Sequence, residues 1–166
     1  MNRIILTGTF LAVCLMTSGI GRAAGRIAVL NFELNDITSL PNTPEEQRRT
    51  ASIQPLLEQA LKQTGNYEMV QIDAAEQAAA NSSFGYLYRF PALAAKLGGQ
   101  FGADWVIVGQ HSKPSFLFSY LIANLVHVKT QSLAASYAIE LKGNHEKVTQ
   151  RSIASLARKI HASLKK

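Results

Sequence analysis

Hydrophobic and polar residues alternate most regularly between residues 132 and 142. Every second position there is apolar, and mostly small or charged residues stand between. The apolar positions are Leu133, Ala135, Tyr137, Ile139 and Leu141. A period of two predicts a β-strand with one face in the core and the other in water.

The preceding run, residues 116–128, is apolar on both sides of the expected strand. It should form a hairpin with residues 132–142 through a turn at residues 129–131. One apolar row is then surplus, and it consists of Leu117, Leu121 and Leu125. Because exposed apolar patches usually mark interaction sites, we interpret this row as a candidate partner-binding surface.

Three shorter runs of apolar and β-branched residues also predict strands, at residues 26–32, 67–72 and 105–112. Residues 33–42 carry a cluster of Asn, Asp, Thr, Ser and Pro, which predicts a connecting loop. The sequence therefore predicts five strands.

A long helix is predicted to begin at Thr43, where Pro44 and Glu46 complete a capping box with proline at the first helical position. Apolar residues then recur at helical spacing, and Gly65 predicts a left-handed stop. The apolar positions are Ile53, Leu56, Leu57, Ala60 and Leu61.

Three further helices are expected. Asp73 begins a short alanine-rich helix that continues to residue 80, and residues 91–97 form another, stopped by Gly98 and Gly99. Asn144 can cap the last helix, whose buried stripe recurs at helical spacing. That stripe is Val148, Ile153, Leu156, Ala157, Ile160 and Leu164.

In order, these elements read β-α-β-α-α-β-β-β-α, which predicts an α+β fold. We expect a mixed five-stranded sheet with its helices mainly on one face. The length suits one domain, residues 24–166.

The first 23 residues have the three-part plan of a secretory signal peptide. Arg3 precedes an apolar stretch that is too short to span a bilayer, and cleavage is expected after Ala23. A lipoprotein signal that uses Cys14, the only cysteine, is the alternative. Removal of the signal leaves a chain without thiol or disulfide, and a periplasmic location is expected.

Loss of Arg3 and Arg22 with the signal lowers the formal charge from +6 to +4. Such a mild excess, spread over the chain, argues only weakly for nucleic acid, and the export signal argues against it. An acidic partner or peripheral contact with an anionic membrane surface stays open.

No set of residues forms a catalytic signature, so we expect no enzyme, no cofactor and no dedicated metal site. The four histidines lie on different elements, although His111 and His127 could meet across neighbouring strands. Glu33 and Asp36 could act as paired carboxylates, or Asp36 could fix its own loop.

A second candidate site depends on strand direction. If the strands ending near Lys113 and Lys142 run the same way, their ends bring lysines and other polar residues to one rim beside a helix N-terminus. Such a rim could hold an anion or the carboxylate of a partner. A capped helix entry with two solvated lysines is the alternative. The rim residues are Lys113, Ser115, Lys142, Asn144 and His145.

The order of several short motifs resembles a bacterial exported family designated as a domain of unknown function. The motifs are Phe32-Leu34-Asp36-Thr38, Gly102-Ala103-Asp104, Val108-Gly109, Lys113 with Ser115, and Leu141 to Asn144. More distantly, the plan is similar to the amino-terminal domain of periplasmic TolB and to curli-secretion and LpoB-type lipoprotein domains. The resemblance implies a mixed sheet and action by binding envelope proteins.

The leading hypothesis is thus a non-catalytic periplasmic accessory or binding protein that docks onto another envelope protein. The alternative is a periplasmic domain that binds a small ligand or an anion. The sequence leaves the oligomeric state open.

Overall fold

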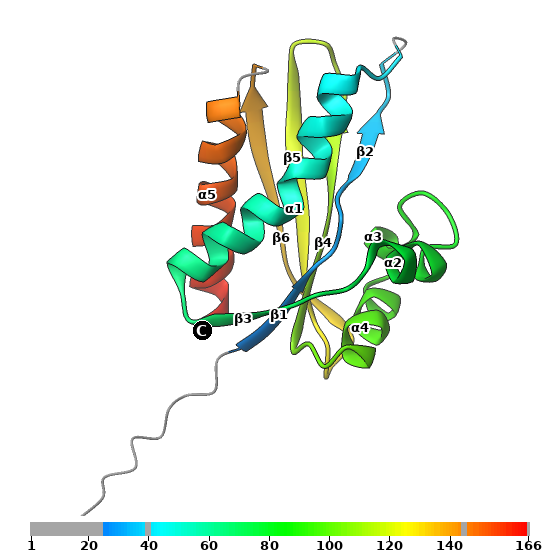
Figure 1. Ribbon diagram of the computed structural model, residues 1–166, viewed down its shortest axis with the longest axis vertical. Coiled ribbons are helices and arrows are strands. Elements are labelled where there is room, and N and C mark those ends of the chain that lie inside the picture. Colours follow the sequence, from blue (N-terminus) through cyan, green and yellow to red (C-terminus); the bar gives the residue numbers. More distant parts are fainter. Residues whose placement is uncertain (1–24, 39–40, 144–145, 166) are drawn as a thin grey trace, which may run out of the picture.

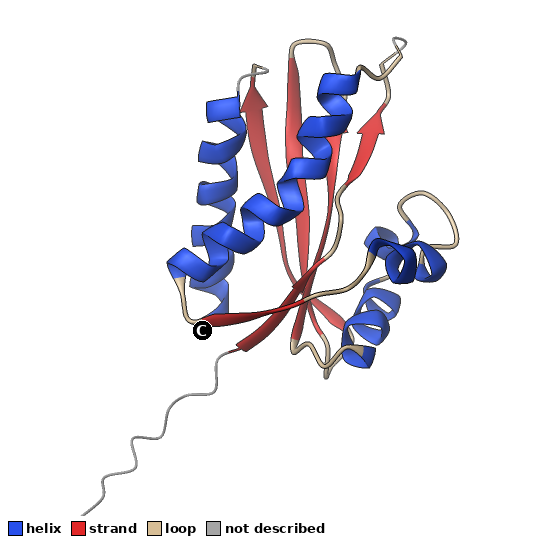
Figure 2. Cartoon of the chain, viewed as in Figure 1, coloured by secondary structure: helices blue, strands red, loops and turns tan. Residues whose placement is uncertain are grey.

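The computed structural model describes residues 25–38, 41–143 and 146–165. The expected signal peptide, with Cys14, lies outside these residues, as do Asn144 and His145. The described chain forms a mixed sheet flanked by helices on both faces (Figures 1 and 2). The α+β prediction is confirmed.

Six strands form the sheet in the described part of the chain. They are β1 (Gly25–Val29), β2 (Glu33–Asp36), β3 (Tyr67–Val70), β4 (Trp105–Lys113), β5 (Phe118–His127) and β6 (Ser132–Lys142). The strand order is β3-β1-β4-β5-β6, and β2 pairs with the far end of β4. The pairs β1–β3, β1–β4 and β2–β4 are parallel, whereas β4–β5 and β5–β6 are antiparallel.

In the described residues, the helices divide into two long and three short ones. The long ones are α1 (Pro44–Thr64) and α5 (Glu146–Leu164), and the short ones are α2 (Ala74–Ala80), α3 (Tyr86–Arg89) and α4 (Pro91–Gln100). Both bonds of the predicted capping box form at the start of α1: Thr43 accepts from the Glu46 N–H, and Glu46 accepts from the Thr43 N–H. This satisfies two of the N–H groups that a helix start leaves free.

The long helices α1 and α5 lie side by side across one face of the sheet (Figure 1). Their buried stripes meet the inward rows of the strands in the larger core. Its largest fully buried members include Ile27, Ile53, Leu57, Ile107, Leu121, Leu125, Ile153, Leu156 and Ile160. The short helices cover only part of the opposite face, where Leu87 and Leu97 pack against Val106 and Val126.

The burial of β5 corrects one prediction. Leu121 and Leu125 are 0% and 1% exposed and belong to the larger core, whereas Leu117 lies before the strand and is 84% exposed. The surplus row is therefore not a surface, because α1 and α5 cover that face of the sheet. The more open face of β5 is the opposite one, where Tyr120 and Ile122 are half-buried.

Two other expectations were wrong. Residues 33–36, predicted as loop, form the additional strand β2 because β4 extends beyond β1 and pairs with it there. Gly98 and Gly99 continue α4 instead of stopping it. A Cβ on Gly98 would lie 2.1 Å from Val106 Cγ2, so this glycine lets the helix pack closely on β4.

Gly65 ends α1 as predicted, but not in the left-handed conformation. Its φ is −155°, which is extended backbone, and its N–H donates to the Leu61 carbonyl. The chain enters β3 two residues later, at Tyr67, so an extended conformation at Gly65 leads directly into the strand.

Candidate functional site

The strongest concentration of polar side chains lies at one end of the sheet, beside the start of α1. Because β4 and β6 both pair antiparallel with β5, they run in the same direction and end at the same rim (Figure 1). Lys113, Ser115 and Gly143 accordingly line one small cavity of about 40 Å³. We name the polar cluster that lines and adjoins it the rim network: Asp36, Glu46, Arg49, Thr50, His111, Lys113 and Ser119.

Lys113 is the central cation of the rim network. Its ammonium group donates to Asp36 Oδ2 at 2.8 Å and also to Glu46 Oε1. The three side chains are only 4–19% exposed. Two carboxylates therefore neutralise this lysine in a cluster that is largely shielded from solvent. This argues against the expectation that Lys113 would hold an anion.

Asp36 is held by three donors. Besides Lys113, the backbone N–H and the hydroxyl of Thr38 donate to its Oδ1 at 2.8 and 2.6 Å. Burial by itself raises the pKa of Asp36, but these hydrogen bonds outweigh it and hold the pKa at about 2. Asp36 thus fixes its own loop, as one of the two sequence interpretations predicted.

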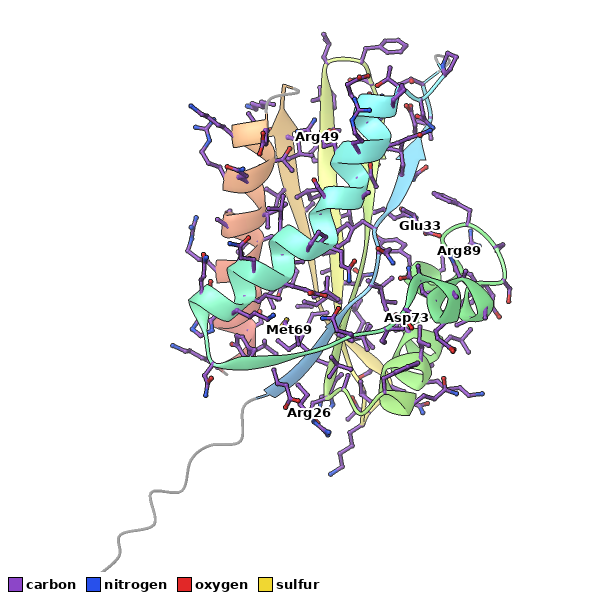
Figure 3. The ribbon with its side chains drawn as sticks, viewed as in Figure 1. Arg26, Glu33, Arg49, Met69, Asp73 and Arg89 are labelled. Carbon is purple, nitrogen blue, oxygen red and sulfur yellow. The ribbon has the colours of Figure 1, made fainter. Side chains whose placement is uncertain are left out.

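Glu33 does not join Asp36 as a paired carboxylate. Its two oxygens accept from the Asn81 side chain at 2.7 Å and from the Gly85 N–H at 2.9 Å. Figure 3 shows Glu33 near the α2–α3 side of the molecule, far from Arg49. The carboxylate fixes the loop before α3, so the paired-carboxylate alternative is wrong.

His111 lies beneath Lys113 on the same face of β4 and is 1% exposed. Its ring nitrogens contact the hydroxyls of Thr50 on α1, at 2.7 Å, and Ser119 on β5, at 3.1 Å. Burial, together with the nearby charge of Arg49, lowers the pKa of His111 to about 4. The ring is therefore neutral at pH 7 and joins three elements by hydrogen bonds.

The His111 pKa predicts a pH dependence of stability. In the unfolded chain His111 takes up a proton near pH 6.5, whereas in the folded chain it does so only near pH 4. Its contribution to the free energy of unfolding is therefore fully present above pH 6.5 and is lost as the pH falls from 6.5 to 4. The loss should approach about 3 kcal/mol. Urea unfolding of the wild type and of His111→Gln at pH 7 and pH 4 would measure it. Equal losses in both proteins would contradict the assignment.

Arg49 connects α1 to the end of β6 and the start of α5 (Figure 3). Its Nε donates to Thr149 Oγ1 at 2.8 Å and its Nη2 donates to the Gly143 carbonyl at 3.1 Å. Burial lowers the pKa of this guanidinium, which nevertheless stays charged. Arg49 thereby fixes the rim end of β6 against both long helices.

The predicted rim is only partly assembled. Lys113 and Ser115 line the same cavity, but the Lys142 side chain is 80% exposed and lies 3.5 Å from Glu140. Asn144 and His145 fall outside the described residues. The sequence interpretation missed the role of Glu46, Arg49 and Thr50 at the rim, which they face from the helix. A helical pattern does not show which distant strand its polar residues meet.

Above the rim network, the chain exposes three large apolar side chains, which we name the apolar tip. They are Ile37, Phe116 and Leu117, at 71%, 63% and 84% exposure. The Ile37 N–H donates to the Lys113 carbonyl at 3.2 Å, so the two loops that carry the tip are joined at their base. Both loops lie at the same end of the sheet (Figure 1).

The chemistry of the rim network is that of a satisfied structural cluster. Within the described ranges, no buried side-chain nitrogen or oxygen lacks a hydrogen-bond partner, and no three His, Cys, Asp or Glu residues gather as metal ligands. His111 and His127 do not meet, since they pair with different residues of the β4–β5 hairpin, Leu121 and Trp105. None of the helices that the structure describes is long and apolar enough to cross a membrane.

Solved structures share this fold at low sequence identity. TolB from Acinetobacter baumannii has a TM-score of 0.54 and 16% identity over 85% of this chain and 28% of its own. The LpoB C-terminal domain from Escherichia coli has a TM-score of 0.50 and 17% identity over 72% and 84%. Lipoprotein GNA1162 from Neisseria meningitidis has a TM-score of 0.50 and 16% identity over 84% and 99%.

These likenesses concern the fold, as the resemblance to TolB and LpoB-type domains implied. A search of curated protein sequences finds no match. A family model covers residues 25–160, which is most of the chain and all of the sheet. The chain therefore belongs to the family DUF3280, described as a protein of unknown function (DUF2380).

Proposed function

We propose that this protein is a non-catalytic accessory or binding protein of the bacterial periplasm that docks onto another envelope protein. The observation that carries the proposal is the apolar tip. Three large apolar side chains in adjoining loops stand in solvent above a rigid polar base, which is the arrangement of an interaction surface and not of a core.

The tip takes the place of the surface proposed from the sequence. Of the earlier row only Leu117 is exposed, and Phe116 and Ile37 extend the surface around it. The rim network supports the tip because Lys113, Asp36 and Glu46 fix the ends of β4 and β2 to α1. A preorganised surface loses less conformational entropy when it binds.

The proposed location also has support. Residues 1–23 have the plan of a signal peptide, and the structures that share the fold include a lipoprotein and TolB. A periplasmic protein partner is consistent with both. Fold alone does not assign a function, so the proposal depends on the tip.

Anion binding at the rim has less support. Lys113, which was to supply the charge, is occupied by two carboxylates, and Lys142 is solvated beside Glu140. A bound anion would have to compete with Asp36, whose pKa of about 2 reflects how firmly it is held. We therefore favour the protein partner.

Site-specific photo-crosslinking in the living cell tests the docking surface. A photoreactive residue at position 117 should give a defined adduct with one envelope protein, identified by mass spectrometry. The same group at Phe84, which is 51% exposed on the α2–α3 loop, is the matched control and should not give that adduct.

A Phe116→Ser substitution should reduce the adduct formed from position 117 at least about tenfold while changing the free energy of unfolding by no more than about 0.5 kcal/mol. Phe84→Ser should change neither quantity. The absence of a defined adduct, or identical adducts from positions 117 and 84, would contradict the proposal.

A further inference from the structure

The last strand of the sheet has an open edge. Within the part of the chain that the structure describes, β6 pairs with β5 on one side and with no strand on the other. It is eleven residues long, and the side chains on its solvent-facing row, at every second position from Ser132 to Lys142, are all exposed. The outer backbone N–H and C=O groups therefore form a template on which another strand can pair.

Natural sheets usually protect such an edge, but β6 carries little protection. It contains no proline, and its charged residues, Glu140 and Lys142, lie near its end. The one irregularity in its pairing lies near Leu133, at its other end. From Ala135 to Ile139 the edge is regular and carries no charge, and proteins rarely leave a regular, uncharged edge open.

A groove runs beside this edge, between β6 and α5. It has a volume of about 400 Å³, and Ile139 and Val148 form its apolar part. Arg151, Ser152 and Ser155 continue it along α5. Outside the groove, Tyr137 donates to Ser163 at 2.7 Å and holds the helix against the strand. A strand added to β6 would direct every second side chain into this groove.

The surroundings of the groove are basic. Lys142 and Arg151 line it, and the exposed face of α5 adds Lys147, Arg158 and Lys159. The opposing charges are Glu140, which contacts Lys142, and Glu146, which accepts from Gln150. The excess of positive charge favours an acidic occupant and disfavours a second copy, since paired β6 edges would bring two basic helices together.

We propose that β6 and its groove form a strand-addition site for an extended segment of a partner polypeptide. That segment carries alternate apolar side chains, which enter the groove, and acidic residues, which meet Lys142 and Arg151. Backbone hydrogen bonds supply most of the affinity, and the groove and its charge supply the selection. The site is separate from the apolar tip and stands without it.

The probe is a capped peptide about nine residues long, with alternating valine and threonine and an aspartate at each end. Amide hydrogen exchange of the exported protein is measured with and without the peptide. The expected result is at least tenfold slower exchange, confined to amides of β6.

Two matched comparisons separate this mode from nonspecific binding. A peptide N-methylated at alternate amides loses its backbone donors and should not protect β6. Arg151→Glu should weaken binding roughly tenfold, whereas Lys96→Glu, on the exposed surface of α4, should leave it unchanged. Both substituted residues are exposed, so folding should be unaffected.

Three outcomes would overturn the proposal. They are equal binding of the N-methylated peptide, equal binding of a peptide with lysines in place of aspartates, and self-association of the protein through β6 at the concentrations used. Failure of the crosslinking at position 117 would leave this site untouched, so the two proposals can fail separately.

Discussion

Replacing Lys113 by methionine is expected to destabilise the protein by roughly 3–5 kcal/mol, because it leaves two carboxylates in a largely dry setting without their cation. Asp36 and Glu46 both bind this ammonium group, and their side chains are 4% and 19% exposed. Urea unfolding at pH 7 would measure the loss. Acidification should shrink the difference from the wild type, since protonation neutralises the stranded carboxylates.

Lys142→Met is the matched control. This lysine is 80% exposed and 3.5 Å from Glu140, so its loss should cost no more than about 0.5 kcal/mol. Asp36→Asn and Glu46→Gln, added to Lys113→Met, should recover most of the stability because no uncompensated charge then remains. A Lys113→Met loss no larger than that of Lys142→Met would refute the central role of this lysine.

Leu125→Ala should destabilise the protein by about 2–5 kcal/mol, because it opens a cavity under α1 and α5. Leu125 is 1% exposed and is part of the larger core. Leu117→Ala, which removes the same atoms at an 84% exposed position, should change the free energy of unfolding by no more than about 0.5 kcal/mol.

Chemical denaturation of both variants under the same conditions measures their free energies of unfolding. The size of each loss shows whether the position lies on the surface or in the core. The sequence interpretation placed the two leucines in the same exposed row, and the structure separates them. Similar losses for Leu117→Ala and Leu125→Ala would contradict the arrangement of β5 under the long helices.

The β5 error shows what periodicity can and cannot establish. In β6 only one row is apolar, so the face that packs against the core follows from the sequence, although only Leu141 of that row is fully buried and Leu133 is 47% exposed. The predicted bounds are those of the strand. In β5 both rows are apolar because α1 and α5 cover one face and α4 covers part of the other, where Val126 is buried. Which face lies under which helix is a tertiary property that one strand does not encode.

The strand β2 was missed because its sequence gives too little strand signal, whereas β5 gives an apolar signal on both faces. Its sequence, Glu-Leu-Asn-Asp, lacks strand character and gives no local signal. It becomes a strand because the end of β4 offers unpaired backbone groups there and β2 hydrogen-bonds to them. Local chemistry was predictable where it was self-contained, as in the capping box of Thr43 and Glu46.

The rim network was predictable only in part, for the same reason. The direction of the strands was enough to bring Lys113 and Ser115 to the end of β6. The partners of Lys113 lie 77 and 67 residues away in the chain, on a strand that was not predicted and on the first turn of a helix. Glu46 was assigned to its capping role, and nothing in the sequence shows that it serves Lys113 as well.

The position of α5 in the chain has a consequence for how the protein acquires its fold. Ribosomes release a chain from its amino terminus, and α5 follows every strand of the described sheet. Until it arrives, the face that holds Leu125 and Leu141 lacks the cover of Ile153, Leu156 and Ile160. Newly emerged chains should therefore expose this apolar face to solvent until α5 has been released and can cover it.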